Sequence, residues 1–155
     1  MLDVLDRDEE FMTAALSEAT VGAAMGEVPV GAVIVKDGEI IATGYNKREA
    51  TGDATAHAEI VAIREACEKL GGWHLDGCEI YVTLEPCPMC MGAIVNSRIK
   101  KVVFGAKDAK AGACGSVFNF NSYPLNHKPE IVSGVMENES RELLSEFFAK
   151  KRKNK

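Results

Sequence analysis

The first part of the chain shows the spacing of one buried helix face. Apolar residues recur every four positions, at Phe11, Ala15, Ala19 and Ala23. This spacing places them on one side of a helix, and Gly26 is the residue that favours its end. Asp6 with Glu9 three positions later is typical of a capping box, so we expect the helix to begin at Asp6.

The pattern then changes to two short runs rich in β-branched residues. These runs, GAVIVK at 31–36 and EIIAT at 39–43, flank the dipeptide Asp37-Gly38. Asp-Gly favours the positive φ angles of a two-residue hairpin turn, and the flanking runs have the composition of strands. The sequence therefore predicts an antiparallel hairpin.

Helical and strand patterns alternate through the rest of the chain. We expect, in order, a polar loop at 46–56, a helix ending at Gly71-Gly72, a strand at 79–84, a helix at 88–96, a strand at 101–104, a loop at 105–129, a weak strand at 131–132 and a helix from Ser140. Strands alternating with helices are typical of a sheet covered on both faces. We therefore predict one α/β domain over 1–155, a three-layer α/β/α sandwich with a mixed central sheet of about five strands.

Composition and charge narrow the class of protein. The 155 residues are 46% hydrophobic with a formal net charge of -5, which is unlike a disordered chain. No apolar stretch approaches the roughly 18 residues of a membrane span. The first ten residues are acidic where a targeting peptide would be basic, so we expect a cytoplasmic protein with no membrane partner. Five cysteines in such a protein favour thiol or metal chemistry over disulfides.

The basic residues are unevenly distributed. The last six positions, 150–155, hold five of the 18 Lys and Arg, which leaves 13 basic against 23 acidic residues in the rest of the chain. Such a run most often keeps a helix end soluble. A contact to nucleic-acid phosphates is the alternative, and charge alone leaves both open.

Two segments carry residues with metal-ligand spacing, each at the expected start of a helix. Cys87 and Cys90 are three positions apart in PCPMC, and His57 begins the segment HAE. Two thiolates and one imidazole suit zinc, and three protein ligands leave the fourth tetrahedral position open to water. The sequence therefore predicts a catalytic site with one zinc ion per subunit.

Two other interpretations of these cysteines stay open. A Cys-x-x-Cys pair also occurs in redox dithiols, although that chemistry has no use for a distant His-x-Glu segment. A closed structural zinc site would need a fourth ligand, for which Cys114 is the main candidate. Cys67 and Cys78 fall in apolar surroundings, so we expect them to pack as small buried residues.

Glu59 favours the catalytic interpretation. A carboxylate two residues after a ligand can take a proton from zinc-activated water and deliver it to a substrate. An isolated glutamate in a first helical turn would only stabilise the helix. His-x-Glu followed by Pro-Cys-x-x-Cys is the signature of the zinc deaminases, so we assign Glu59 as the catalytic residue.

Longer segments connect this signature to one family. The sequence resembles the bacterial tRNA-specific adenosine deaminases of the cytidine-deaminase-like superfamily in VPVGAVIV, AHAEI, YVTLEPCPMCMGA, RIKKVVFGAKDAKAGACGS and LLSEFF. The resemblance implies a cytidine deaminase-like fold, a homodimer, and conversion of adenosine to inosine at the wobble position of a tRNA anticodon stem-loop. In that reaction a zinc-activated hydroxide attacks C6, and Glu59 protonates N1 and the leaving amine. Anticodon bases are already unpaired, which lowers the cost of bringing one into a site.

The resemblance also implies substrate contacts. It assigns them to Val28, Pro29, Asn46, Ala58, Pro86, Asp108, Lys110, Phe148 and Arg152. Without the resemblance, Asn46 would be interpreted as a loop residue that bonds its own backbone, and Phe148 as a core residue. Lys107 would join Lys110 and the basic tail in a local basic strip. Cys114 departs from the family, which often has a small residue without a thiol there.

Two other functions compete with this one. A related zinc deaminase would act on free cytidine, deoxycytidylate or guanine, but would not need the basic final helix. A non-catalytic zinc-binding RNA module would share the ligands but would have no use for Glu59. Assays with an anticodon stem-loop beside free nucleosides separate the first alternative, and a Glu59→Gln variant separates the second.

Overall fold

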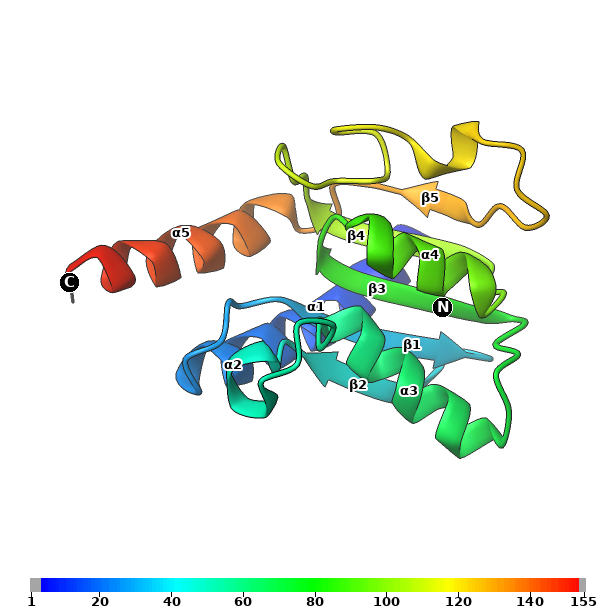
Figure 1. Cartoon of the computed structure of the whole chain (residues 1–155), viewed down its shortest axis with the longest axis horizontal. Coiled ribbons are helices and arrows are strands. Elements are labelled where there is room, and N and C mark those ends of the chain that lie inside the picture. Colours follow the sequence, from blue (N-terminus) through cyan, green and yellow to red (C-terminus); the bar gives the residue numbers. More distant parts are fainter. Residues whose placement is uncertain (1–3, 154–155) are drawn as a thin grey trace.

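The computed structural model describes residues 4–153, which form one five-stranded sheet with helices packed against it (Figure 1). The strands are β1 (Gly31–Lys36), β2 (Glu39–Tyr45), β3 (Cys78–Leu84), β4 (Lys101–Ala106) and β5 (Glu130–Val132), in the spatial order β2-β1-β3-β4-β5. β1 is antiparallel to both β2 and β3, whereas β3, β4 and β5 run parallel. The prediction of a mixed sheet of about five strands is confirmed.

Helices cover both faces of this sheet. They are α1 (Val4–Ala24), α3 (Ala58–Leu70), α4 (Pro88–Asn96) and α5 (Glu137–Lys153), with the short α2 (Arg48–Thr51) and the 3-10 turn η1 (Phe120–Ser122) in loops. Residues of α3 and α4 share one core with one face of the sheet, and residues of α1 share a second core with the other. This is the expected three-layer α/β/α arrangement.

The strands feed both cores through their two-residue side-chain period. On β3, Ile80 and Val82 belong to the core under α3 and α4, while Tyr81 between them belongs to the core under α1. Val103 of β4 joins the second core in the same way. A strand buried on both faces has no polar side, which is why these segments read as continuous apolar runs in the sequence.

The predicted hairpin is confirmed. Asp37 and Gly38 have φ angles of 52° and 79°, which are the positive values that a two-residue turn of this class requires. Lys36 pairs directly with Glu39 across the turn.

Several expected boundaries differ from the observed ones. Helix α1 already includes Val4, so Asp6 lies within its first turn and the predicted capping box is wrong. β2 and β4 run two residues further than expected, to Tyr45 and Ala106. Helix α5 begins at Glu137 rather than Ser140, because acidic residues in the first turn favour the positive end of a helix.

Helix α3 lies directly on the backbone of β2. A Cβ atom at Gly44 would stand 2.5 Å from the carbonyl oxygen of Ala58 and 2.8 Å from the amide nitrogen of Ala62. Any side chain there would push the helix off the strand. The missing side chain therefore sets how deeply the first turn of α3 sits against the sheet.

The final helix extends beyond the sheet. The last turns of α5 run away from the body of the molecule (Figure 1) and carry four basic residues, Lys150, Lys151, Arg152 and Lys153. Residues 154–155 of the expected basic tail lie outside the described residues. No helix among residues 4–153 is long and apolar enough to cross a membrane.

Candidate metal centre and active site

A cavity of about 170 Å³ opens where the carboxyl ends of β2, β3 and β4 meet the starts of α3 and α4. This edge is where α/β sheets usually bind ligands. The cavity is lined by Val28, Val30, Asn46, Arg48, His57, Glu59, Leu84, Glu85, Cys87, Asp108 and Ala111. Segments far apart in the chain thus meet around one small space.

The two cysteines are aligned by the prolines around them. Cys87 is the N-cap of α4, with an extended backbone at φ -79° and ψ 174°, because a residue before proline avoids the helical region. Pro88 suits the first helical position. Cys90 follows three residues after Cys87, a spacing that keeps two side chains on one side of a helix. Both sulfur atoms therefore point toward the same place.

His57 completes a set of three ligand atoms. Its Nδ1 atom lies 3.7 Å from Sγ of Cys87 and 3.6 Å from Sγ of Cys90. Tetrahedral zinc with ordinary bond lengths would separate a nitrogen and a sulfur ligand by about 3.6 Å, so the spacing fits this ion. Within residues 4–153 the group has three members, and Cys114 is not one of them. Three ligands leave one coordination position for water or substrate.

The charges of this group suit a cation. The thiol of Cys90 donates to Cys87, and this bond together with one from His57 lowers the pKa of Cys87 to about 4. The hydrogen bond with Cys87 raises the pKa of His57, and the hydrogen bond with Cys87 and burial raise that of Cys90. The cluster therefore holds a thiolate at neutral pH, which is the form that ligates a metal.

Glu59 stands beside the ligands in the first turn of α3 and lines the same cavity. Its side chain is 3% exposed, and burial raises the pKa of its carboxyl to about 7. A carboxyl with that pKa can hold or release a proton near neutrality, as a general acid or base requires.

Asn46 connects the end of β2 to the start of α3. Its side-chain Oδ1 accepts a hydrogen bond of 2.8 Å from the backbone N–H of Ala58. His57, the N-cap residue, makes no side-chain capping bond of its own. The side chain of Asn46 therefore takes the place of the missing capping acceptor at the start of α3. It bonds the backbone of this helix rather than the backbone of its own loop.

The other expected contact residues divide into two groups. Val28 and Asp108 line the cavity, whereas Pro29, Ala58, Pro86 and Lys110 do not. Oδ1 of Asp108 accepts from the N–H groups of Lys110 and Ala111, so this carboxylate also shapes its own loop.

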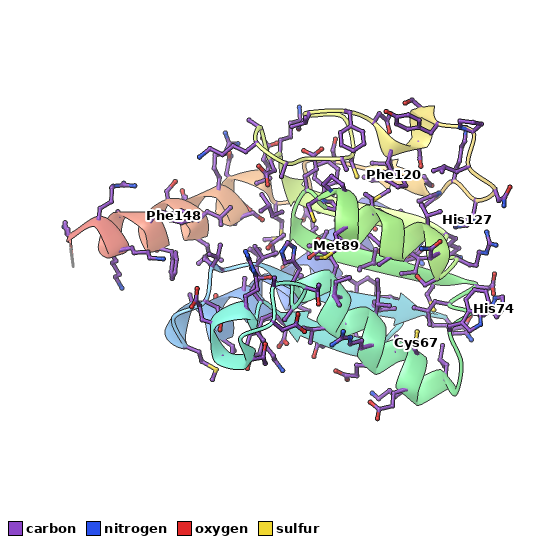
Figure 2. The ribbon with its side chains drawn as sticks, in the orientation of Figure 1. Cys67, His74, Met89, Phe120, His127 and Phe148 are labelled. Carbon is purple, nitrogen blue, oxygen red and sulfur yellow. The ribbon has the colours of Figure 1, made fainter. Side chains whose placement is uncertain are left out.

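Two expected contact residues lie away from the cavity, on α5. Phe148 is 40% exposed rather than a core residue, and Arg152 is exposed in the last turn. Figure 2 shows Phe148 well separated from Met89, which marks the start of α4.

The cavity also contains residues that sequence reasoning missed. Leu84 is an apolar residue at the carboxyl end of β3, a position that is itself a signal for this edge of an α/β sheet, whereas Val30 directly precedes the antiparallel β1. Arg48 is an exposed cation on α2. Glu85 is a buried carboxylate between β3 and Pro86. The sequence signal that could have identified it is an acidic residue directly after a buried strand. Ala111 carried none.

Glu85 is enclosed by hydrogen-bond donors. Burial by itself would raise the pKa of its carboxyl, but bonds from the Ser116 hydroxyl and from the N–H groups of Asp108, Cys114 and Ser116 outweigh burial and lower the pKa. The carboxylate is therefore charged at neutral pH.

Known proteins share this arrangement of sequence and fold. Residues 5–106 match the family model described as the cytidine and deoxycytidylate deaminase zinc-binding region. The chain is 51% identical to the tRNA-specific adenosine deaminase of Bacillus subtilis, over 97% of this chain and 94% of that protein. It is 54% identical to the tRNA-specific adenosine deaminase of Aquifex aeolicus, over 94% and 97% of the two chains.

Solved structures of deaminases also superimpose on this chain. A structure from a study of A-to-I editing by tRNA:A34 deaminases at the wobble position superimposes with a TM-score of 0.85, at 48% identity over 87% of this chain and 99% of that chain. The guanine deaminase of Bacillus subtilis superimposes less closely, with a TM-score of 0.61 at 36% identity over 93% of each chain.

Proposed function

The chain belongs to the zinc-binding cytidine and deoxycytidylate deaminase family, and from that premise we propose that it hydrolyses adenosine to inosine at the wobble position of tRNA. One observation carries the choice of substrate. Identity to tRNA-specific adenosine deaminases reaches 51% and 54% over nearly the full length, against 36% for a guanine deaminase. The alternative of a free-nucleoside or free-base deaminase is therefore not favoured.

The residues of the site have different roles in this reaction. His57, Cys87 and Cys90 would hold a zinc ion, which would lower the pKa of water to about 7 and so make a nucleophile for C6 of the base available at neutral pH. Glu59 would accept a proton from the attacking water and deliver it to N1. It would then take the proton of the new C6 hydroxyl and pass it to the amine, which leaves C6 as ammonia. One water is consumed, and adenosine becomes inosine.

The size of the cavity fits a single base. Pockets that enclose a whole drug-sized ligand measure roughly 300–1,000 Å³, and this one measures about 170 Å³. The reacting base would be enclosed while the ribose and the flanking nucleotides stay outside. A nucleotide in an anticodon loop can present its base in this way without breaking a pair.

Asn46 and Asp108 are proposed to orient the nucleotide whose base enters the cavity. The bond from Ala58 to Oδ1 fixes the amide group of Asn46, which leaves its Nδ2 donor for an acceptor on the substrate. Val28 contributes apolar surface, and Asp108 lines the cavity from the loop at 107–116. Pro29, Ala58 and Pro86 act indirectly in this proposal, through the backbone segments that carry the lining residues.

Contacts to the rest of the RNA are proposed for the basic residues outside the cavity. Lys107 and Lys110 are exposed on the loop that carries Asp108, where they can meet backbone phosphates. Phe148 and Arg152 lie further away on α5, so they would contact the stem-loop at a distance from the reacting base. We also propose a cytoplasmic location, because tRNA is modified and used there.

A homodimer is proposed as the working form. Met89 lies on α4 between the two cysteine ligands and exposes 36% of its surface, which supports an interface close to the site. Sedimentation velocity should show a dimer for the zinc-loaded protein and a monomer for Met89→Glu, because an interface disfavours a buried unpaired charge. A wild-type monomer at micromolar concentration would contradict the proposal.

The reaction and its substrate are tested together by comparing RNA with free compounds. The zinc-loaded protein is incubated with an anticodon stem-loop that has a wobble adenosine, and separately with adenosine, cytidine and guanine at equal concentration. Chromatography of the nucleosides after nuclease digestion should show inosine from the RNA only. A stem-loop with guanosine at that position is the matched control. Turnover of free compounds alone would overturn the proposal.

A further inference from the structure

A single buried carboxylate holds the inner side of one complete loop. Glu85 is 2% exposed, and one of its oxygens accepts a bond of 3.0 Å from the N–H of Asp108. The other accepts bonds of 2.9 and 3.1 Å from the N–H groups of Cys114 and Ser116. The Ser116 hydroxyl also donates to Glu85. All four donors belong to the loop at 107–116.

The loop is built closely around this carboxylate. A Cβ atom at Gly112 would overlap the carboxyl group of Glu85, so any larger residue at this position would displace the carboxylate. The N–H of Ala113 donates to the carbonyl oxygen of Pro86 at 2.9 Å, next to Glu85 in the chain. Convergent backbone N–H groups of this kind form a concave site for an anion, and here a side chain of the protein fills it.

The same loop forms one wall of the active site. Asp108 and Ala111 line the cavity together with Glu85 itself, whereas Lys107 and Lys110 are exposed on the outer side. The metal ligands and Glu59, by contrast, are placed by the starts of α3 and α4. The groups that perform the chemistry are therefore carried by other elements than this loop.

We propose that Glu85 is a positioning residue that holds the loop at 107–116 as the substrate-binding wall of the cavity. This inference rests on the proposed function. Glutamine has the size of glutamate but keeps only one acceptor oxygen, and its amide N–H groups would face donors of the loop. Glu85→Gln therefore loosens the wall while it leaves the volume of the site unchanged.

The test is a kinetic comparison of Glu85→Gln with the wild type on the anticodon stem-loop. We expect KM to rise about tenfold, as one lost charged hydrogen-bond network would give, while kcat stays within about twofold and one zinc per chain is retained. Hydrogen exchange at the N–H groups of Asp108, Cys114 and Ser116 should become faster. The control is Asp8→Asn, because Asp8 is also a buried carboxylate but bonds Lys101 and Tyr81, a residue of the second core. It should lower stability without changing KM.

A second variant approaches the same contact from the loop. Gly112→Ala places a methyl group against the Glu85 carboxylate and should give the same rise in KM, and the double variant should add little to either single change. An unchanged KM in both single variants, or a fall in kcat together with loss of zinc, would overturn the inference. A wild-type protein inactive on the RNA would instead overturn the proposed function.

Discussion

Asn46 has two separable tasks, and two substitutions distinguish them. Its Oδ1 accepts the N–H of Ala58 at 2.8 Å in a buried position, and its Nδ2 is the proposed donor to the substrate. Asn46→Ala removes both groups. Asn46→Asp keeps an acceptor at the helix start, where a negative charge is favourable by about 0.3–1 kcal/mol, but it removes the donor.

The expected magnitudes follow from the burial of this bond. Leaving the N–H of Ala58 without a partner costs about 1–3 kcal/mol, so Asn46→Ala should lower the free energy of unfolding by that amount. Asn46→Asp should unfold with nearly the wild-type free energy. Both variants should lose roughly tenfold or more in kcat/KM, because 1.4 kcal/mol of lost transition-state binding is a factor of ten.

Two measurements check these expectations. Urea unfolding of the zinc-loaded proteins gives the free energies, and initial rates of inosine formation in the anticodon stem-loop give kcat/KM. Wild-type activity in Asn46→Asp would refute the contact between Nδ2 and the substrate. Wild-type stability in Asn46→Ala would refute the argument that this side chain supports the start of α3.

Three further perturbations test other parts of the structure. Glu59→Gln should keep its zinc and its RNA affinity, as measured by metal analysis and filter binding. It should lose about 10²- to 10⁴-fold in kcat, because Glu59 moves protons and is not a ligand. A normal rate would disprove the mechanism. Gly44→Ala should cost about 3 kcal/mol or more in thermal unfolding, because its Cβ would stand 2.5 Å from a carbonyl oxygen of α3; an unchanged Tm would contradict this packing. Cys114 is partly buried, and burial raises its pKa to about 12, so at pH 8 iodoacetamide should alkylate it about a thousandfold more slowly than an ordinary thiol, as followed by peptide mass spectrometry. Equal rates would show that its surroundings do not raise its pKa.

The parts of the fold that the sequence predicted are those with local causes. Asp37-Gly38 determines its own backbone angles, and the runs beside it pair because the turn is short. The capping box at Asp6 failed because Val4, two positions earlier, is already helical, and a capping pattern does not exclude an earlier start. The early start of α5 was missed for a similar reason, since the apolar spacing begins only several residues after the helix does.

In the candidate site, too, the residues paired by local spacing could be predicted, and a residue that depends on distant contacts could not. Cys87 and Cys90 are paired by their spacing on one helix, and the signature adds His57, which the structure places within 3.7 Å of both. Glu85 was missed because its donors lie more than twenty residues further along the chain. Its role exists only once the loop at 107–116 has folded back onto Glu85 itself. Phe148 was ambiguous because apolar spacing on α5 does not say how far the helix extends past its support.

The overhang of α5 makes the molecule an electric dipole. The 17 residues of α5 span about 25 Å. The helix has acidic residues in its first turn and four basic residues in its last turn. The rest of the chain is net acidic. A polyanion approaching such an object exerts a torque that turns the basic end forward before contact. The acidic body then need not repel its partner, and the rate of encounter should depend steeply on ionic strength while the chemical step does not.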